Sequence, residues 1–200
     1  MQGVEVVQAR APAPDPVSDR DAVIEKMSQA LSSTRTAQGK FVQSDPNDPR
    51  ANASGAFYIS RPGKVRFEYT SPEPMFIVSD GVSLSVEEPK RKSFDAIPLK
   101  SHPLNLFLKS NIDLKRDGMV KDVAQANGAW FVTLVDTTGE AEGRMILEFR
   151  ASDFELMGWR VIDGTGAETV TRLSGVTTNA SLKPSLFIVK DPADRGDDRR

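Results

Sequence analysis

The sequence predicts an α+β protein in which short helices cover one strongly curved antiparallel sheet of about ten strands. Three observations lead to this prediction. An apolar stripe with helical period occurs near the start of the chain, a period of two dominates the remainder of the chain, and a second helical stretch interrupts the strands midway. No change of composition along the 200 residues marks a second domain.

We expect a single domain over residues 18–190, flanked by flexible tails. Residues 1–17 contain alternating prolines, which favour extended and unpaired backbone, and residues 191–200 are charged and unpatterned. The opening stretch MQGVEVVQARAPAPDPVSDRD has neither a basic start nor a long apolar segment, so it is not an intact signal peptide. Two origins stay open: a cytosolic protein, or an exported one whose signal peptide has been removed.

The first regular element is predicted to be a helix of about 15 residues that follows Ser18. Ser18 is a candidate N-cap, and Asp21 places negative charge in the first turn, which favours a helix N-terminus. Gly39 is expected to end any extension of this helix. The apolar stripe has the spacing i, i+4, i+7 and i+8 and consists of Val23, Met27, Ala30 and Leu31.

After this helix the apolar period changes to two, which predicts strands separated by turns such as Asp80-Gly81 and Asn127-Gly128. The alternation is clearest over residues 64–70, where large apolar side chains alternate with charged ones. The expected strands are 40–44, 55–60, 64–70, 75–79, 82–87, 91–96, 129–136, 144–150, 154–162, 167–175 and 185–189.

Residues 96–115 interrupt the strands with a helical spacing. Leu104, Phe107 and Leu108 lie at i, i+3 and i+4, and Pro103 suits the first turn of a helix. We therefore expect one or two short helices here, covering one face of the sheet.

Composition argues against several classes of function. The 26 basic and 28 acidic residues are mixed along the chain without a basic stripe, which gives little support to nucleic-acid binding. The sequence contains no run of about 18 apolar residues, so no membrane span is predicted. The chain has no cysteine, which excludes thiol catalysis and a cysteine-based zinc site.

The motifs favour a protein that is not an enzyme. His102 is the only histidine, and its place between Ser101 and Pro103 is more typical of a surface residue than of a general base. Nucleotide-binding, serine-hydrolase and zinc-protease motifs are absent from the sequence. Asp45 and Asp48 lack the spacing of a calcium loop. We therefore expect no catalytic residue, no cofactor and no metal.

The order and spacing of several short stretches resemble the bacterial LolA-type outer-membrane lipoprotein carriers. The resemblance extends over residues 19–192, and the closing SLFIVKDP is similar to the final strand of that family. Two features depart from the family: Phe67 stands where tryptophan is frequent, and SLSVEE lacks the usual aromatic residues. The stretches are FVQ at 41–43, Gly55-Ala56-Phe57, RPGKVRFEYTSP at 61–72 and IVSDG at 77–81.

The resemblance implies an unclosed antiparallel β-barrel of about 10–11 strands with a lid of short α-helices over a hydrophobic cavity. It implies a monomeric periplasmic carrier, its signal peptide removed, for triacylated lipoproteins. Such a carrier takes its cargo from an inner-membrane ABC transporter and hands it to a LolB-like outer-membrane receptor. It holds no cofactor, breaks no bond, binds no nucleic acid and approaches membranes only transiently. One sixteen-carbon chain contributes about 12 kcal/mol of membrane attachment, so aqueous transfer requires such a protein.

By the same resemblance, Arg61 is the candidate latch that holds the lid closed, since a guanidinium donates well to unpaired carbonyls at helix C-termini. The alternative is a solvated arginine beside a Pro-Gly turn. The apolar strand faces are by themselves typical of an ordinary core. With the resemblance they predict an acyl-chain cavity lined by Phe41, Phe57, Ile59, Val65, Phe67, Phe76, Val78, Leu84, Leu104, Phe107, Leu108, Met145 and Leu147, with Met27 and Leu31 in the lid.

Other functions are compatible with the same fold. A LolA-like carrier of glycolipids or hopanoids is one alternative, which the Phe67 and SLSVEE departures leave open. A sensor of stray lipoproteins is another, although such regulators usually have an additional domain. An enzyme that acts on lipids is disfavoured because no nucleophile–base pair is found.

Overall fold

The structure, a computed structural model, describes residues 17–116 and 119–191. The predicted tails lie almost wholly outside these residues, and the predicted domain boundaries stay a prediction. The elements are α1 (Val17–Ser33), β1 (Thr36–Asp45), β2 (Asp48–Ser60), β3 (Lys64–Ser71), β4 (Met75–Asp80), β5 (Ser83–Glu88), β6 (Ser93–Pro98), η1 (Leu99–Ser101), η2 (Pro103–Leu106), β7 (Val120–Ala126), β8 (Ala129–Val135), β9 (Arg144–Arg150), β10 (Leu156–Ile162), β11 (Glu168–Thr178) and η3 (Pro184–Phe187).

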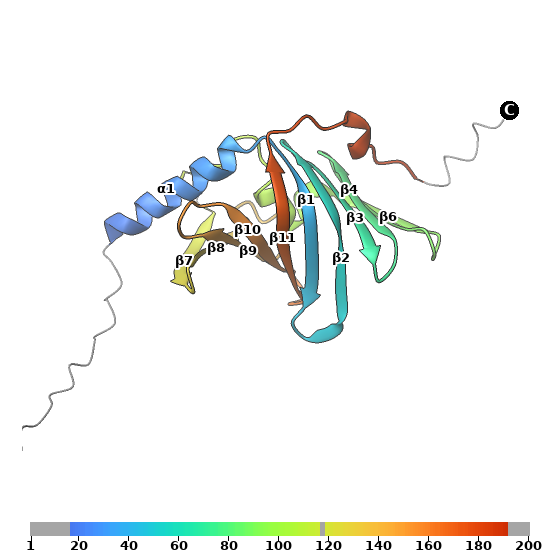
Figure 1. Ribbon diagram of the computed structural model, residues 1–200, viewed down its shortest axis with the longest axis horizontal. Helices are drawn as coiled ribbons and strands as arrows, with labels where there is room; N and C mark the ends of the chain where they lie inside the picture. Colours follow the sequence, from blue (N-terminus) through green and yellow to red (C-terminus); the bar gives the residue numbers. More distant parts are fainter. Residues whose placement is uncertain (1–16, 117–118, 192–200) are drawn as a thin grey trace, which may run out of the picture.

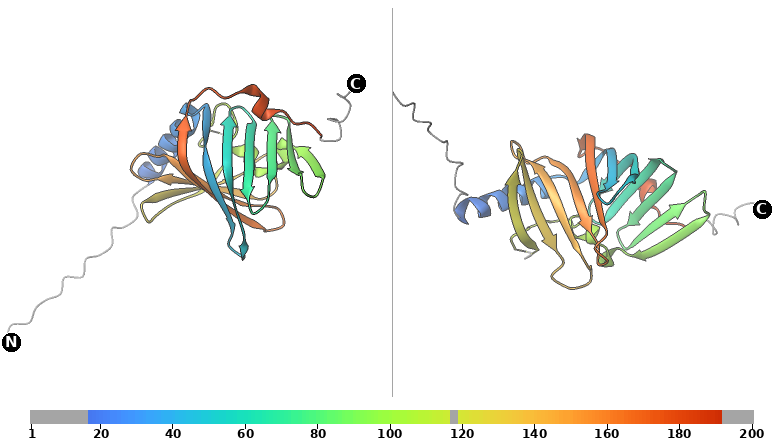
Figure 2. Two further views of the ribbon diagram at one scale, coloured as in Figure 1. Left: turned by 45° about the vertical axis from the view of Figure 1, so that its right-hand side comes forward. Right: turned by 90° about the horizontal axis from the view of Figure 1, so that it is seen from below.

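The strands form one 11-stranded antiparallel sheet in the order β6-β5-β4-β3-β2-β1-β11-β10-β9-β8-β7. The first and last strands of the chain pair at its centre, and the other strands follow on either side. β6 and β7 are the two edges and do not pair with each other, so the curved sheet forms a barrel that stays open (Figures 1 and 2). The predicted α+β class and unclosed antiparallel barrel are confirmed.

The long helix α1 buries the predicted stripe, with Met27 and Leu31 almost completely enclosed. It begins at Val17, so Ser18 lies inside the helix rather than before it. It ends at Ser33, and the prediction that Gly39 limits it is wrong, since Gly39 lies within β1. Among the described residues, no helix is long and apolar enough to cross a membrane.

Residues 99–116, which we call the lid segment, contain the two short helices expected between residues 96 and 115. Both are 3₁₀-helices rather than α-helices. We call the lid segment together with α1 the lid, which therefore combines one long α-helix with short 3₁₀-helices. Pro103 occupies the first turn of η2, as expected. The lid segment belongs to the same hydrophobic core as α1 and the sheet, and its large buried side chains are Leu99, Leu104, Leu106, Phe107, Leu108, Ile112 and Leu114.

The strand predictions fail at two places. β7 was not predicted because VKDVAQA has only Val120 and Val123 as large apolar residues, a composition typical of an edge strand. The expected final strand 185–189 is instead the 3₁₀-helix η3, which starts at Pro184, a residue without the N–H that a ladder needs. η3 contacts β3 and β4 on the outside of the sheet (Figure 1).

Gly55 allows β2 and β3 to pair closely. A Cβ atom built at this position would lie 1.9 Å from the carbonyl oxygen of Glu68, which belongs to rigid strand backbone. We expect Gly55→Ala to lower the free energy of unfolding by about 1–3 kcal/mol, because the strands must separate to admit the methyl group. Urea denaturation measures this change.

Gly164→Ala is the matched control for that substitution. A Cβ at Gly164 meets only the flexible side chain of Glu142, which can move aside. Equal stability losses for the two variants would contradict the steric explanation.

Candidate functional site

Aromatic side chains from distant strands meet on the concave face of the sheet. The Phe41 ring on β1 packs edge-to-face against Phe67 and Tyr69 on β3, with ring centroids 5.3 Å and 4.9 Å apart. Phe67 in turn lies 6.0 Å from Trp159 on β10, and Trp159 lies 5.3 Å from Phe107 in the lid segment. The rings therefore connect the sheet to its lid.

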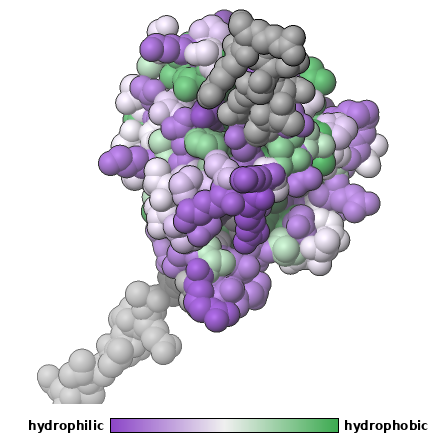
Figure 3. Space-filling view, turned by 90° about the vertical axis from the view of Figure 1, so that its right-hand side faces the viewer, coloured by the Kyte–Doolittle hydropathy of each residue, from purple (hydrophilic) through white to green (hydrophobic). Residues whose placement is uncertain are grey.

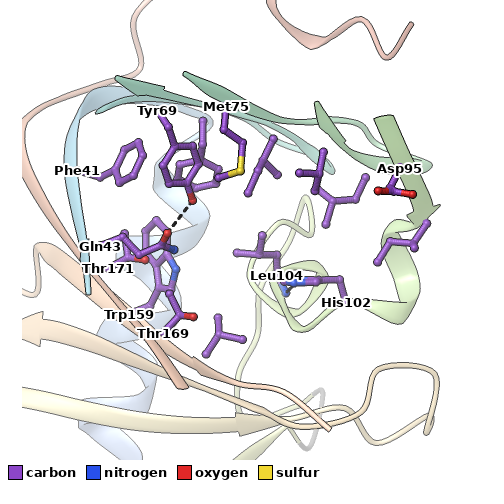
Figure 4. A pocket seen from close by; sticks show the side chains of 16 residues that line it. Phe41, Gln43, Tyr69, Met75, Asp95, His102, Leu104, Trp159, Thr169 and Thr171 are labelled. Carbon is purple, nitrogen blue, oxygen red and sulfur yellow. Dashed lines mark hydrogen bonds between the residues drawn. The ribbon is translucent and has the colours of Figure 1, made fainter. Parts of the chain in front are cut away.

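One cavity lies between the sheet and the lid segment, and a second lies between the sheet and α1. The β6-side cavity has a volume of about 360 Å³ and contains both apolar and polar side chains: Phe41, Gln43, Phe67, Tyr69, Met75, Ile77, Leu84, Val86, Asp95, Ile97, His102, Leu104, Trp159, Val161, Thr169 and Thr171 (Figure 4). The α1-side cavity has a volume of about 270 Å³, and its lining includes Leu31, Ala37, Phe57, Ile59, Arg61, Phe149, Phe154, Leu156, Leu173 and Val176.

The predicted lining residues fall into three groups, two of which lie on the concave side. The first group borders a cavity: Phe41, Phe67, Leu84 and Leu104 on the β6 side, and Leu31, Phe57 and Ile59 on the α1 side. The second group has no exposed surface and packs in the core around the lid segment: Met27, Val65, Phe107, Leu108, Met145 and Leu147. The third group, Phe76 and Val78, lies elsewhere.

Phe76 and Val78 point to the outer face of β4, so their prediction as cavity residues is wrong. Met75 and Ile77, which alternate with them, line the β6-side cavity instead. On the outer face the Arg66 guanidinium lies 5.1 Å from the centroid of the Phe76 ring. Because Met75, Phe76, Ile77 and Val78 are all apolar, the period of two could not distinguish the faces of this strand.

Trp159 and the polar lining were not predicted. The strand 156–162 carries apolar side chains in both directions, so the sequence pattern does not distinguish its inner face. In the structure Trp159 is the cross-strand partner of Thr171, and Thr171 is the partner of Gln43. This pairing joins residues far apart in the chain, and only the strand register reveals it.

His102 lies in the lid rather than on the open surface, which corrects the prediction. Its Nδ1 accepts a hydrogen bond from the Leu104 backbone N–H at 3.1 Å and so caps η2. Burial lowers the pKa of His102, and Asp163 opposes this effect. The ring is therefore neutral at pH 7 and able to accept that bond. No group of three or more potential metal ligands occurs in residues 17–116 and 119–191.

Arg61 follows β2 and joins both parts of the lid. Its Nε donates to the carbonyl of Phe107, the C-cap of η2, at 3.0 Å. Its Nη1 donates to the carbonyls of Leu31 at 3.1 Å and Thr34, at the end of α1. Carbonyls at a helix C-terminus lack partners within the helix, so one guanidinium satisfies groups from two helices at once.

The Arg61 side chain keeps its charge in this partly buried position. Burial lowers the pKa of Arg61 to about 10, which still leaves the guanidinium protonated at neutral pH. Its central carbon lies 5.7 Å from the centroid of the Phe107 ring, an arrangement that adds a cation–π contact.

Further polar contacts tie the lid segment to its surroundings. The backbone N–H of Gly63 donates to the Leu108 carbonyl at 2.8 Å. From α1, the Ser32 hydroxyl donates to the Ile112 carbonyl at 2.9 Å, and the Ser28 hydroxyl accepts from the Leu114 N–H at 3.1 Å. An apolar lid is therefore held in place by hydrogen bonds at its rim.

Comparison with known proteins finds a matching family model and similar sequences. The model of the family described as outer membrane lipoprotein carrier protein LolA matches residues 32–190. The outer-membrane lipoprotein carrier protein of Dechloromonas aromatica is 29% identical over 189 residues, covering 89% of this chain and 88% of that protein. The protein of the same name from Methylococcus capsulatus is 29% identical over 176 residues, covering 84% and 83%.

Solved structures share the fold. A LolA superfamily protein from Nitrosomonas europaea superposes with a TM-score of 0.50 at 12% identity, covering 84% of this chain and 96% of that one. A DUF1329 family protein from Desulfovibrio piger superposes with a TM-score of 0.52 at 12% identity, covering 88% and 98%. The open, helix-covered sheet is thus found in distant sequences.

We expect Arg61→Leu to increase the binding of an apolar fluorophore several-fold. The substitution removes the donors to Phe107 and to the end of α1, each worth about 1.5–3 kcal/mol as a charged hydrogen bond, so the lid opens more often. Fluorescence titration with a dye that emits in apolar surroundings measures the change.

Arg66→Leu serves as the control for this experiment. Arg66 lies in the strand that follows Arg61, but it faces outward and pairs with Glu68 at 2.6 Å. If the Arg61 variant binds no more dye than wild type and the Arg66 variant do, Arg61 does not hold the lid closed and is only a turn residue.

Proposed function

Because this chain belongs to the family of outer-membrane lipoprotein carrier proteins, we propose that it binds the acyl chains of lipoproteins on the concave face of its sheet and carries them through the periplasm. The donor would be an inner-membrane ABC transporter and the acceptor a LolB-like receptor of the outer membrane. The protein would be exported with a signal peptide that is then removed, and it would act without a chemical reaction.

The observation that supports this proposal is the lid segment itself. It places six large side chains on the concave side of the sheet, at roughly 1.5–3 kcal/mol of burial each: Leu104, Leu106, Phe107, Leu108, Ile112 and Leu114. The total of roughly 9–18 kcal/mol brackets the roughly 12 kcal/mol of one sixteen-carbon chain. Burial of the lid side chains and burial of one acyl chain are therefore of the same order, so an acyl chain can offset the loss of lid contacts on loading.

The size of the cavities indicates that this conformation is not the loaded one. Their volumes are about 360 Å³ and about 270 Å³, the first near and the second below the lower limit of the roughly 300–1,000 Å³ typical of pockets for small ligands. A lipoprotein with three acyl chains requires more room than either. Movement of the lid segment would join the two cavities and expose Val65, Met145 and Leu147 as additional apolar wall.

The exterior agrees with a closed lid. The face on the β6 side is mainly hydrophilic, with only small hydrophobic patches between the polar side chains (Figure 3). Most of the apolar lining lies beneath this exterior, with Leu84 and Leu104 buried, whereas Ile97 at the β6 edge is 45% exposed. Relatives that are named lipoprotein carriers favour lipoproteins over glycolipids or hopanoids as the cargo.

The proposal predicts that the purified protein releases acylated lipoprotein from inner-membrane vesicles that contain the releasing transporter and ATP. After centrifugation, lipoprotein should appear in the supernatant in a stable complex with the protein. An unacylated version of the same lipoprotein is the control and should not form this complex, because the acyl chains supply the affinity.

A carrier of established activity is assayed with the same vesicles as the positive control. If that carrier releases lipoprotein from the same vesicles and this protein releases none, the proposed function is wrong. The Arg61→Leu variant should accept lipoprotein but transfer less of it to acceptor vesicles, since its unloaded state is no longer favoured by a closed lid.

A further inference from the structure

One wall of the β6-side cavity is polar although the rest is apolar. Gln43 on β1, Tyr69 on β3, and Thr169 and Thr171 on β11 gather around one end of the cavity (Figure 4). We call these four residues the polar wall. The remaining sides are mainly apolar, with Met75, Ile77, Leu84 and Leu104 among the residues that form them.

Strand pairing brings the polar wall together. Gln43 and Thr171 are direct cross-strand partners on β1 and β11. Tyr69 lies one strand further, beyond β2, and its cross-strand partner there is Gly55. Because Gly55 has no side chain, the tyrosine reaches over β2, and its hydroxyl donates to Gln43 Oε1 at 2.9 Å. Burial raises the pKa of Tyr69 to about 12, which keeps this hydroxyl protonated at neutral pH.

The polar wall has donors that the protein does not use. The Gln43 amide nitrogen and the hydroxyls of Thr169 and Thr171 make no side-chain hydrogen bond to any described residue. Either orientation of the amide leaves a donor in the cavity: Nε2–H when Oε1 accepts from Tyr69, or the Tyr69 hydroxyl if the amide is turned. These donors lie on accessible surface within the cavity, where the acceptor of a ligand can replace water as their partner.

The charges around the cavity define which acceptor fits. None of its lining residues is lysine or arginine, and its only carboxylate is Asp95 on β6. His102, also in the lining, is kept neutral by burial and uses Nδ1 to cap η2. A phosphate or carboxylate would therefore meet no positive charge and one negative charge. A neutral oxygen acceptor on an otherwise apolar molecule matches both the donors and the charge.

We propose that the polar wall binds the ester or amide carbonyl at the head of an acyl chain. This inference rests on the proposed function and adds which part of the lipid anchor the protein recognises. The chain beyond the carbonyl extends along the apolar sides of the cavity, and the carbonyl oxygen accepts from Gln43 with support from the threonine hydroxyls. The site thereby distinguishes acylated lipids from hydrocarbons or ethers of equal length.

The test compares two fluorescent ligands of the same length, a hexadecanoyl ester and its hexadecyl ether, which lacks the carbonyl. Wild-type protein should bind the ester about 3- to 10-fold more tightly, the amount that one hydrogen bond contributes. Gln43→Leu should remove most of this preference, because the ester loses the main donor to its carbonyl whereas the ether has no carbonyl to be affected. Thr171→Val should reduce the preference in part, and it serves as the second variant should Gln43→Leu fail to fold by circular dichroism.

Met75→Leu is the control, because it changes an apolar side of the same cavity and should keep the ester preference. Equal affinity of wild-type protein for ester and ether would overturn the inference while leaving acyl-chain binding intact. Retention of the full preference in both Gln43→Leu and Thr171→Val would also overturn it. Binding of neither ligand would instead refute the proposed function, and with it the premise of this site.

Discussion

The contact between Arg61 and the carbonyls of two helices joins α1 to the lid segment. Its guanidinium bonds to the last turn of α1 and to the C-cap of η2, while its own backbone N–H donates to the Arg35 carbonyl next to α1. Each of these charged hydrogen bonds contributes about 1.5–3 kcal/mol to this arrangement. Arg61 therefore stabilises the lid segment against α1 and the sheet.

The packing between the lid segment and the sheet links the Arg61 contacts to the aromatic cluster. Phe107 contacts Trp159 as well as Arg61, so one side chain belongs both to the hydrogen-bonded rim and to the aromatic cluster on the sheet. A ligand that displaces Phe107 from the cluster also disturbs the arginine contacts. In the proposed function, Phe107 would therefore couple ligand binding against the sheet to opening of the lid.

The sequence was informative where one face of an element is apolar and the other is polar. The α1 stripe and the alternation at residues 64–70 satisfy this condition, and both elements lie where they were expected. Residues 75–78 are apolar throughout, and the inner face there was assigned wrongly. The polar wall could not be predicted, because Gln43, Tyr69 and Thr171 become neighbours only through the pairing of strands from opposite ends of the chain.

The unpaired edges β6 and β7 affect how much volume the curved sheet can enclose. In a closed barrel, the number of strands and their stagger determine the radius, and the interior can grow only if hydrogen bonds between strands break. Here the ladder ends at both edges, so the sheet can flatten or tighten by small changes of twist at every strand while its hydrogen bonds persist. The open edges thus allow the width of the interior to change without loss of the ladder, which in the proposed function would let one protein enclose acyl chains of unequal bulk.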